Sequence, residues 1–140
     1  MCDEFRIGKR NAEGYMDLTT YQAIRSVDTK KFSFRPIIYV CSPYSGDTAG
    51  NTEKAKRYSR FVVDKGGIPM TPHLFLPLFM REETERDLAI FMGLALLSKS
   101  AELWVFGDVI SEGMQIEISH AQRKGKPVRF VSKEDLKCMK

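Results

Sequence analysis

Short runs of apolar residues recur along the chain, separated by segments with helical spacing. Ile37 to Cys41 is a continuous run of β-branched, aromatic and small side chains, which is typical of a strand buried on both faces. Three further runs predict strands of the same kind: Ile68 to Thr71, Leu103 to Phe106, and Val128 to Val131. Each run is followed by Gly, Pro, Ser or Asp, so the strands are short.

Helices are predicted between these strands. The first begins at Asn51 as N-cap, because apolar residues recur at helical spacing from there to Gly66. The second has a capping box formed by Thr84 and Asp87 and is apolar nearly all round, so it should be buried on more than one side. A dimer interface is one way to bury it. A third helix follows Ser111, and Ser132 is a candidate cap for a short last helix.

Strands that alternate with helices predict an α/β fold with a doubly wound parallel sheet in three layers. The natural strand order is 2-1-3-4, and a fifth strand at one edge is left open. Such sheets bind ligands beyond the carboxyl ends of their strands, where the strand order reverses. This places the predicted site between the loop that follows Cys41 and the loop that follows Phe106.

Glu117 is the most informative acidic residue. Met114, Ile118 and Ala121 are spaced as one face of the third helix, and Glu117 lies on that face. A carboxylate in an apolar stripe needs a partner, a proton or access to water. The simplest alternative is a Glu at the edge of the stripe that reaches solvent.

Composition limits the classes of protein. The chain has 140 residues, 43% of them hydrophobic and 29% charged, which suits one globular domain. The net charge of +4 is scattered, so no nucleic-acid partner is expected. Cys2, Cys41 and Cys138 have no metal-ligand spacing, so we expect reduced thiols and no metal. No cofactor is expected either, since nucleotide-binding motifs are missing. There is no signal or membrane segment, and a cytoplasmic protein is the expectation.

Residues 1 to 35 differ from the rest. They mix charged and polar residues, with one weak helical candidate from Leu18 to Val27. We expect an extension that is partly ordered or packed on the domain formed by residues 36 to 140.

Two polar loops carry the candidate binding residues. Ser42, Tyr44, Ser45 and Gly46 follow the first strand, and small residues there allow a ligand to approach the backbone. Residues Asp108, Ser111 and Gly113 precede the third helix, whose N-terminus favours an anion. Ser111 also fits a plain N-cap and Gly113 a plain turn. Neither loop matches a dinucleotide or P-loop motif.

Asp87 and His73 complete the candidates. His73 follows Pro72 in a loop, and Asp87 also fits a helix-capping acid. If Asp87 and Glu117 share one crevice, one carboxylate can attack an anomeric carbon while the other protonates the leaving group. Sequence spacing leaves open whether they meet.

Four segments together resemble the nucleoside 2-deoxyribosyltransferase-like superfamily. They are the run Tyr39 to Gly46, Glu85-Arg-Asp-Leu88, the run Ser111 to Ala121, and Gly125-Lys-Pro-Val128. The superfamily includes deoxyribosyltransferases, nucleoside 5′-monophosphate N-glycosidases and the uncharacterised DUF4406 type of bacterial and phage proteins, to which this chain looks closest. The resemblance covers residues 36 to 131 and implies a flavodoxin-like fold and a homodimer or larger homo-oligomer.

The resemblance also implies residue roles. Glu117 matches the nucleophile that attacks C1′ of the sugar, and Asp87 matches the acid that interacts with the base. Tyr39 and Ser42 border the sugar. Ser111 stands where monophosphate glycosidases hold phosphate, whereas Pro43 replaces a phosphate-binding Ser, so the need for a 5′-phosphate stays open.

The sequence thus predicts an N-glycosidase or deoxyribosyltransferase acting on a nucleoside or nucleoside 5′-monophosphate, with Glu117 and Asp87 as catalytic residues. The alternative is a non-catalytic protein that binds a nucleotide or sugar phosphate, an accessory protein of a phage or mobile element. The predicted binding residues are Tyr39, Ser42, Tyr44, Ser45, Gly46, His73, Asp108, Ser111 and Gly113.

Overall fold

Four parallel strands form the central sheet of the computed structural model, which describes residues 34–137. They are β1 (Ile37–Cys41), β2 (Ile68–Met70), β3 (Glu102–Val105) and β4 (Val128–Phe130), arranged in the order β2-β1-β3-β4. The predicted fold class and strand order are therefore confirmed. Within the described residues no fifth strand joins this sheet.

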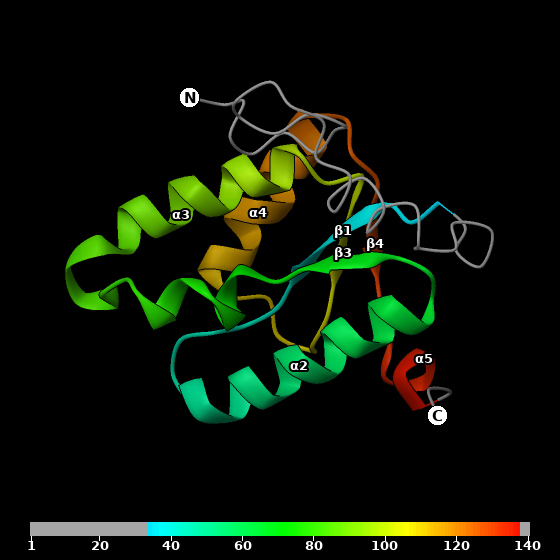
Figure 1. Cartoon of the computed structure of the whole chain (residues 1–140), viewed down its shortest axis with the longest axis horizontal. Helices are drawn as coiled ribbons and strands as arrows, with labels where there is room; N and C mark the ends of the chain where they lie inside the picture. The colour runs from blue at the N-terminus through cyan, green and yellow to red at the C-terminus, as the bar shows by residue number, and fades with distance from the viewer. Residues whose placement is uncertain (1–33, 138–140) are drawn as a thin grey trace, which may run out of the picture. The chain divides into compact units, whose positions relative to one another are not determined.

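Helices cover both faces of the sheet (Figure 1). α2 (Thr48–Asp64) and the short α5 (Lys133–Lys137) lie on one face, and α3 (Glu82–Ser98) and α4 (Glu112–Arg123) lie side by side on the other. Two 3₁₀ turns, η2 (Pro72–Leu74) and η3 (Leu76–Leu78), join β2 to α3 because the prolines in this segment prevent a longer regular helix.

The alternation of side chains along β1 divides the core into two layers. Tyr39 and Cys41 face the α3 and α4 side, whereas Ile38 and Val40 face α2. All four are almost fully buried, since the central strand of a doubly covered sheet has no exposed face. β1 therefore points every second side chain into the layer that holds Glu117.

The start of α2 differs from the prediction. Asp47, not Asn51, is the N-cap, and its carboxylate accepts a hydrogen bond from the Gly50 N–H at 3.1 Å. Gly46 precedes it with φ of 91°, a conformation that glycine adopts readily. Asn51 lies one turn inside the helix and has another role in the loop that precedes it.

The start of α3 also differs. The predicted capping box of Thr84 and Asp87 is wrong, because the helix begins at Glu82 and no side chain caps it at Arg81. Instead, the Glu85 carboxylate accepts a hydrogen bond from the Arg81 N–H at 2.9 Å. Glu85 has non-helical backbone angles, φ −122° and ψ 17°, which kink the first turn. The acid that accepts a hydrogen bond from the backbone at the start of α3 is therefore Glu85.

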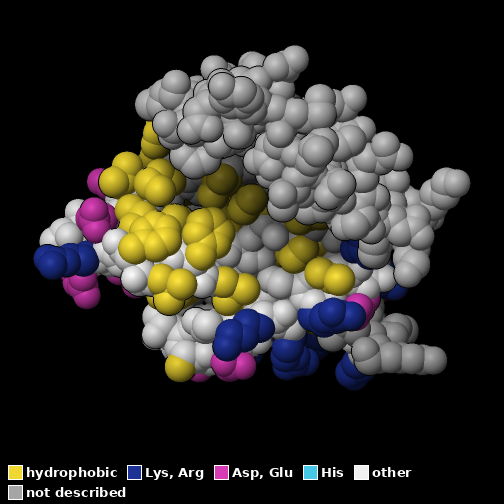
Figure 2. All heavy atoms as spheres, in the orientation of Figure 1, with side chains coloured by type: hydrophobic (Ala, Val, Ile, Leu, Met, Phe, Trp, Pro, Cys, Tyr) yellow, Lys and Arg dark blue, Asp and Glu magenta, His cyan; other side chains and the backbone are white. Residues whose placement is uncertain are grey.

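The α3 helix is buried less than predicted. Only Gly93 and Leu97 are buried, and Leu88 and Phe91 are 50% and 70% exposed. The sheet and α4 cover one side of the helix, but no described element covers the other. Figure 2 shows apolar side chains gathered over this outer side.

Some of the sequence predictions fall outside the described residues. These are most of the expected extension of residues 1 to 35, its helical candidate Leu18 to Val27, and the cysteines Cys2 and Cys138. Over residues 34–137, no helix combines the length and apolar character needed to span a lipid bilayer.

Candidate active site

The loops after β1 and β3 meet at the carboxyl edge of the sheet, where the strand order reverses. The Phe106 N–H donates to the Cys41 carbonyl at 2.9 Å, which continues the strand pairing into the loops. Gly107 has φ of 98°, and a Cβ added there would lie 3.6 Å from Pro43 Cδ. The two loops that were predicted to border the ligand site are therefore in contact.

Glu117 extends from α4 toward β1 and is partly buried. Its neighbours Met114, Ile118 and Ala121 are buried in the core, as the spacing predicted. The Tyr39 hydroxyl donates to Glu117 Oε2, and the Cys41 thiol donates to Oε1 at 3.4 Å. Each carboxylate oxygen thus has one donor from β1.

Burial raises the pKa of Glu117 to about 7, because the charged carboxylate loses water. The hydrogen bonds from Tyr39 and Cys41 act in the opposite direction and lower this pKa. Burial also raises the pKa of the Tyr39 phenol and of the Cys41 thiol above their usual ranges. Near neutral pH both donors are therefore neutral, and the pKa of Glu117 lies close to that pH.

Gly93 of α3 lets the helix approach this pair. A Cβ added at Gly93 would lie 3.2 Å from the Tyr39 hydroxyl oxygen, so the absence of a side chain keeps space for the hydroxyl. Tyr39 is 1% exposed. α3 thus holds the phenol in place from the side opposite to β1.

The loop after β1 presents a buried hydroxyl. Ser42 is 1% exposed, and its Oγ has no hydrogen-bond partner within residues 34–137. Its carbonyl oxygen lies 3.0 Å from His73 Nε2, and since a carbonyl can only accept, Nε2 carries the proton. The His73 ring stacks on Tyr44 with centroids 5.1 Å apart, and burial lowers the pKa of His73, so this ring is neutral near pH 7.

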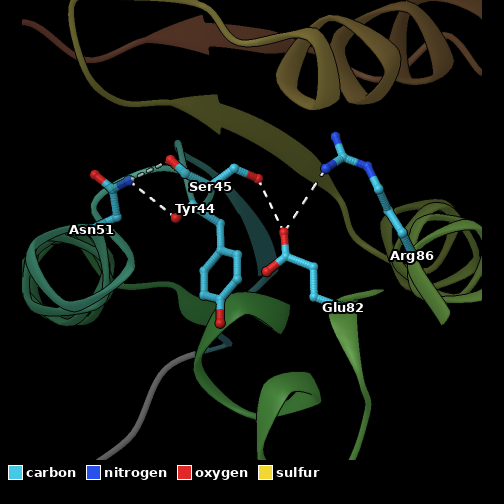
Figure 3. Close-up of polar contacts among 5 residues, drawn as sticks. All are labelled: Tyr44, Ser45, Asn51, Glu82 and Arg86. Atoms are coloured by element: carbon cyan, nitrogen blue, oxygen red, sulfur yellow. Dashed lines mark hydrogen bonds and ion pairs between the residues drawn. The ribbon is translucent and has the colours of Figure 1, made fainter. Parts of the chain in front are cut away.

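A second polar group joins this loop to α3 (Figure 3). The Ser45 hydroxyl donates to Glu82 at 3.2 Å, and Arg86 approaches the same carboxylate at 3.8 Å. The Asn51 amide donates to the carbonyls of Tyr44 and Ser45 at 3.1 and 3.2 Å. These contacts fix the loop conformation and place the acid Glu82 beside it.

Asp87 is exposed and makes no hydrogen bond or ion pair to another described residue. The structure thus gives no contact between Asp87 and Glu117 in the described part of the chain. Arg86 lies one heptad before Gly93, so in the regular part of α3 these two share a face, whereas Asp87 is turned away from it by about 100°.

The predicted binding residues around the start of α4 have structural roles in the protein: one caps the helix and another forms an ion pair. The Ser111 hydroxyl accepts the Met114 N–H at 3.3 Å, so it is an N-cap in the structure. Asp108 pairs with Lys133 of α5 at 2.7 Å, and this pair is largely exposed. Gly113 has no atom within 4 Å of an added Cβ, so the protein itself does not require glycine there.

A cavity of about 450 Å³ lies on the other face of the sheet from Glu117. Phe61, Trp104, Lys65 and Arg129 are among its lining residues, and the first two belong to the α2 side of the core. Glu117 does not line it. The acid instead lies between α3, α4 and the carboxyl end of β1.

Sequence reasoning missed three residues of this region. Cys41 was read as an ordinary thiol, yet its position two residues after Tyr39 places both on one face of β1, which was a usable signal. Glu82, the first residue of α3, accepts from Ser45 and pairs with Arg86, whereas the predicted helix began later, after Thr84. No local sequence pattern reveals that contact.

Comparison with known proteins supports the fold. A solved 2-deoxyribosyltransferase from the psychrotolerant bacterium Bacillus psychrosaccharolyticus is similar, with a TM-score of 0.55 and 19% identity over 67% of this chain and 70% of that one. At this identity the likeness shows a shared flavodoxin-like fold. No curated protein matches the chain.

The sequence also matches a family of domains. The match covers residues 36–131, the span of the resemblance described above, and the family is a domain of unknown function, DUF7768. The expected DUF4406 type is not the family that matches, whereas the deoxyribosyltransferase-like fold is supported. The chain therefore belongs to the DUF7768 family.

Proposed function

We propose that this protein cleaves or transfers the N-glycosidic bond of a nucleoside or nucleoside 5′-monophosphate, with Glu117 as the nucleophile. The observation that carries the proposal is the setting of Glu117, a partly buried carboxylate with a pKa of about 7 and a neutral donor on each oxygen. Perturbed acids of this kind concentrate at catalytic sites. The shared fold with a 2-deoxyribosyltransferase is consistent with the proposal.

The proposed reaction has two steps. A Glu117 oxygen forms a bond to C1′ while the C1′–N bond breaks, and the electron pair leaves with the base, which takes a proton. Water then attacks C1′ of the glycosyl ester and gives hydrolysis, or a second base attacks and gives transfer. A covalent intermediate divides one difficult displacement into two easier ones.

Several groups in the loops at the carboxyl edge of the sheet suit such a substrate. The unpaired Ser42 hydroxyl has the burial and the free hydrogen-bonding capacity to bind a sugar hydroxyl. The stacked rings of Tyr44 and His73 offer an aromatic surface to a base. Ser111 at the N-terminus of α4 is our candidate for a 5′-phosphate contact, and Gly46 and Asp108 stay predicted binding residues on the same loops.

Asp87 is proposed as the acid that interacts with the leaving base. It is exposed on α3 and has no described partner, so it is free to meet a substrate. Glu82 is a second acid near the site, held by Ser45. Comparing Asp87→Asn with Glu82→Gln separates the two, and we expect the larger loss of base release from Asp87→Asn.

Chromatography of a panel of nucleosides and monophosphates, with and without an acceptor base, tests the proposal. We expect base release by the wild type and at least a hundredfold loss in Glu117→Gln, because the amide is not a nucleophile. Glu53→Gln is the control, because it makes the same chemical change at an exposed position of α2. Equal release by wild type and Glu117→Gln would remove the proposal.

A non-catalytic nucleotide-binding protein is the second candidate. It is favoured by one observation, the lack of contact between Asp87 and Glu117 in the described chain. Thermal shift in the presence of monophosphates, nucleosides or inorganic phosphate detects binding. Stabilisation by a monophosphate with no turnover of the panel would favour this candidate over the enzyme.

We also propose that two copies of the chain pack through α3. Large apolar side chains of α3 and of the segment before it are exposed, namely Leu78, Phe79, Leu88 and Phe91. Figure 2 shows apolar side chains gathered over this part of the surface, and such patches mark interaction surfaces. A second copy suits the charges. The first turn of α3 is acidic, whereas Lys99 follows its end and the end of α4 carries Arg123, Lys124 and Lys126. Antiparallel packing brings these opposite charges together.

A further inference from the structure

Cys41 has a contact that the proposed chemistry does not use. It is fully buried at the end of β1, and its sulfur lies 3.4 Å from Glu117 Oε1 and 3.9 Å from the Met114 carbonyl oxygen. No described cysteine or metal-ligand cluster adjoins it. The carboxylate is therefore its closest polar neighbour.

The thiol at this position is a donor. Burial, and then the nearby Glu117 charge, raise the pKa of Cys41 far above its usual range, so the thiol keeps its proton through the neutral range. A protonated thiol can donate one hydrogen bond, although a weak one. The carboxylate oxygen at 3.4 Å is better placed to accept it than the carbonyl at 3.9 Å.

We propose that Cys41 is a positioning residue for Glu117, whose thiol holds Oε1 while the Tyr39 hydroxyl holds Oε2, and that Oε1 is the oxygen that attacks. The attack by Oε1 rests on the proposed function, whereas the positioning of the carboxylate by Cys41 does not depend on it. It assigns a role to a side chain that sequence analysis treated as an ordinary core thiol.

Rotation of the carboxylate is the physical reason. The last torsion of a glutamate side chain is broad and roughly two-fold, so one hydrogen bond fixes a single oxygen and leaves the plane free to tilt. Tyr39 and Cys41 lie two residues apart on one face of β1 and reach opposite oxygens. Two donors on a rigid central strand fix the plane of the carboxylate.

The difference between the two donors selects the attacking oxygen. A phenol is the stronger donor and engages a lone pair of Oε2, whereas the weak thiol bond leaves Oε1 more nucleophilic. When Oε1 forms the bond to C1′, Oε2 becomes the ester carbonyl and still accepts from Tyr39. The thiol bond to Oε1 is released, and the electrons of the C1′–N bond leave with the base.

Few groups in the described chain compete for this carboxylate. From β1 the titratable groups that face Glu117 are Tyr39 and Cys41. The residue of α3 that comes close to the Tyr39 hydroxyl is Gly93, which carries no charge. His120 of α4 is hydrogen-bonded to Ser98 at 2.9 Å. The titration of Glu117 therefore reports on the two β1 donors.

Substitution of Cys41 tests the proposal in the full chain. Carbon-13 NMR of the glutamate side-chain carboxyls, assigned with Glu117→Gln, follows the titration of Glu117. In Cys41→Ala the lost donor should raise the pKa of Glu117 above its value of about 7, by up to about one unit. In Cys41→Ser the hydroxyl replaces the donor, and the titration should return to or below the wild-type value.

The rate gives the second readout. In Cys41→Ala we expect the acid limb of the pH–rate profile to move with the titration and the plateau above it to fall about three- to tenfold, because the carboxylate plane is no longer fixed. Cys41→Ser should restore the plateau in part. If Cys41 had only a structural role, neither variant would move the acid limb, and Cys41→Ala and Cys41→Ser would have the same plateau.

Val105→Ala is the matched control. Val105 pairs with Cys41 on the neighbouring strand and is equally buried, but it donates nothing to Glu117. It should lower the melting temperature and leave the titration unchanged. Identical titration of Glu117 in wild type, Cys41→Ala and Cys41→Ser would overturn the proposal. Because this titration needs no substrate, a wild type without turnover would refute the proposed function separately.

Discussion

At the scale of single residues, the balance at Glu117 decides the chemistry. Burial opposes its charge, while neutral donors from Tyr39 and Cys41 support it, and burial is the larger effect because the pKa rises from 4.5 to about 7. A group with this pKa is ionised often enough to attack and is still easily protonated. The position of Glu117 on the apolar face of its helix could be predicted from spacing. The spacing of Tyr39 and Cys41 puts both on one face of β1, but it does not show that they reach the two oxygens of Glu117.

Glu117→Gln should stabilise the protein at high pH. Since the folded state holds this proton more tightly, the contribution of Glu117 to stability is full below pH 4.5 and is lost as the pH rises through about 7. The amide has no such dependence. We therefore expect a gain of about 1–3 kcal/mol at pH 8 and little change near pH 4.5, from thermal or urea unfolding at both pH values. An equal effect at both would contradict the burial of the charge.

At the scale of elements, β1 and α3 position the site together. β1 supplies both donors, and α3 approaches the Tyr39 hydroxyl at Gly93. The strands and the face of α4 were predicted from local periodicity. The starts of α2 and α3 were predicted at the wrong residues, although their contacts are local. The Asp47 carboxylate accepts from the Gly50 N–H, and the Arg81 N–H donates to Glu85, in place of the caps expected at Asn51 and Thr84.

Gly93→Ala separates stability from activity. The added methyl improves helix propensity by up to about 1 kcal/mol but lies 3.2 Å from the Tyr39 hydroxyl oxygen, which must shift by a few tenths of an ångström. We expect a nearly unchanged free energy of unfolding and at least a fivefold loss of turnover, because the Tyr39 to Glu117 contact is disturbed. Wild-type turnover in this variant would show that the phenol need not be held by α3.

Gly67→Ala should be destabilising for a different reason. A Cβ there would lie 2.7 Å from Ile38 Cγ1 and 2.9 Å from Val62 Cγ1, and both side chains are buried in the α2 layer. We expect a loss of about 1–3 kcal/mol in urea unfolding. Gly113→Ala is the control, since nothing lies within 4 Å, and it should be neutral or slightly stabilising. Equal stability of the two variants would contradict the packing at Gly67.

At the scale of the whole molecule, the outer face of α3 is the main unexplained surface. The sequence predicted an apolar helix buried on more than one side, and the described chain buries one side. The first turn of α3 is acidic, whereas the ends of α3 and α4 are basic. If the α3 helices of two copies pack antiparallel, the acidic turn of one copy faces the basic ends of the other. A second copy is therefore the occupant that we expect.

Phe91→Glu tests this pairing. It places a charge on the exposed apolar side of α3, where it should separate two copies with little effect on the fold of one, because Phe91 is 70% exposed. Light scattering with size exclusion should give a dimer for the wild type and a monomer for the variant. Lys54→Glu on the exposed side of α2 is the control and should stay dimeric. A monomeric wild type, or a variant that stays dimeric, would contradict the proposal.

The amino-acid sequence by itself determined the elements and their order. Local periodicity defines which residues form strands and which helix face is apolar, and the handedness of parallel connections then leaves few arrangements of the sheet. The spacing of Met114, Ile118 and Ala121 puts Glu117 on the apolar face of its helix, but it left open whether the carboxylate is buried or reaches solvent.

Only the tertiary structure decided which atoms meet. The contacts of Glu117 with Cys41, of Ser45 with Glu82 and of Asp108 with Lys133 join residues far apart in the chain. Such contacts depend on how layers pack to within an ångström, and periodicity carries no information on that. The burial that raises the pKa of Glu117 is of the same kind, because it is produced by every element around the carboxylate at once.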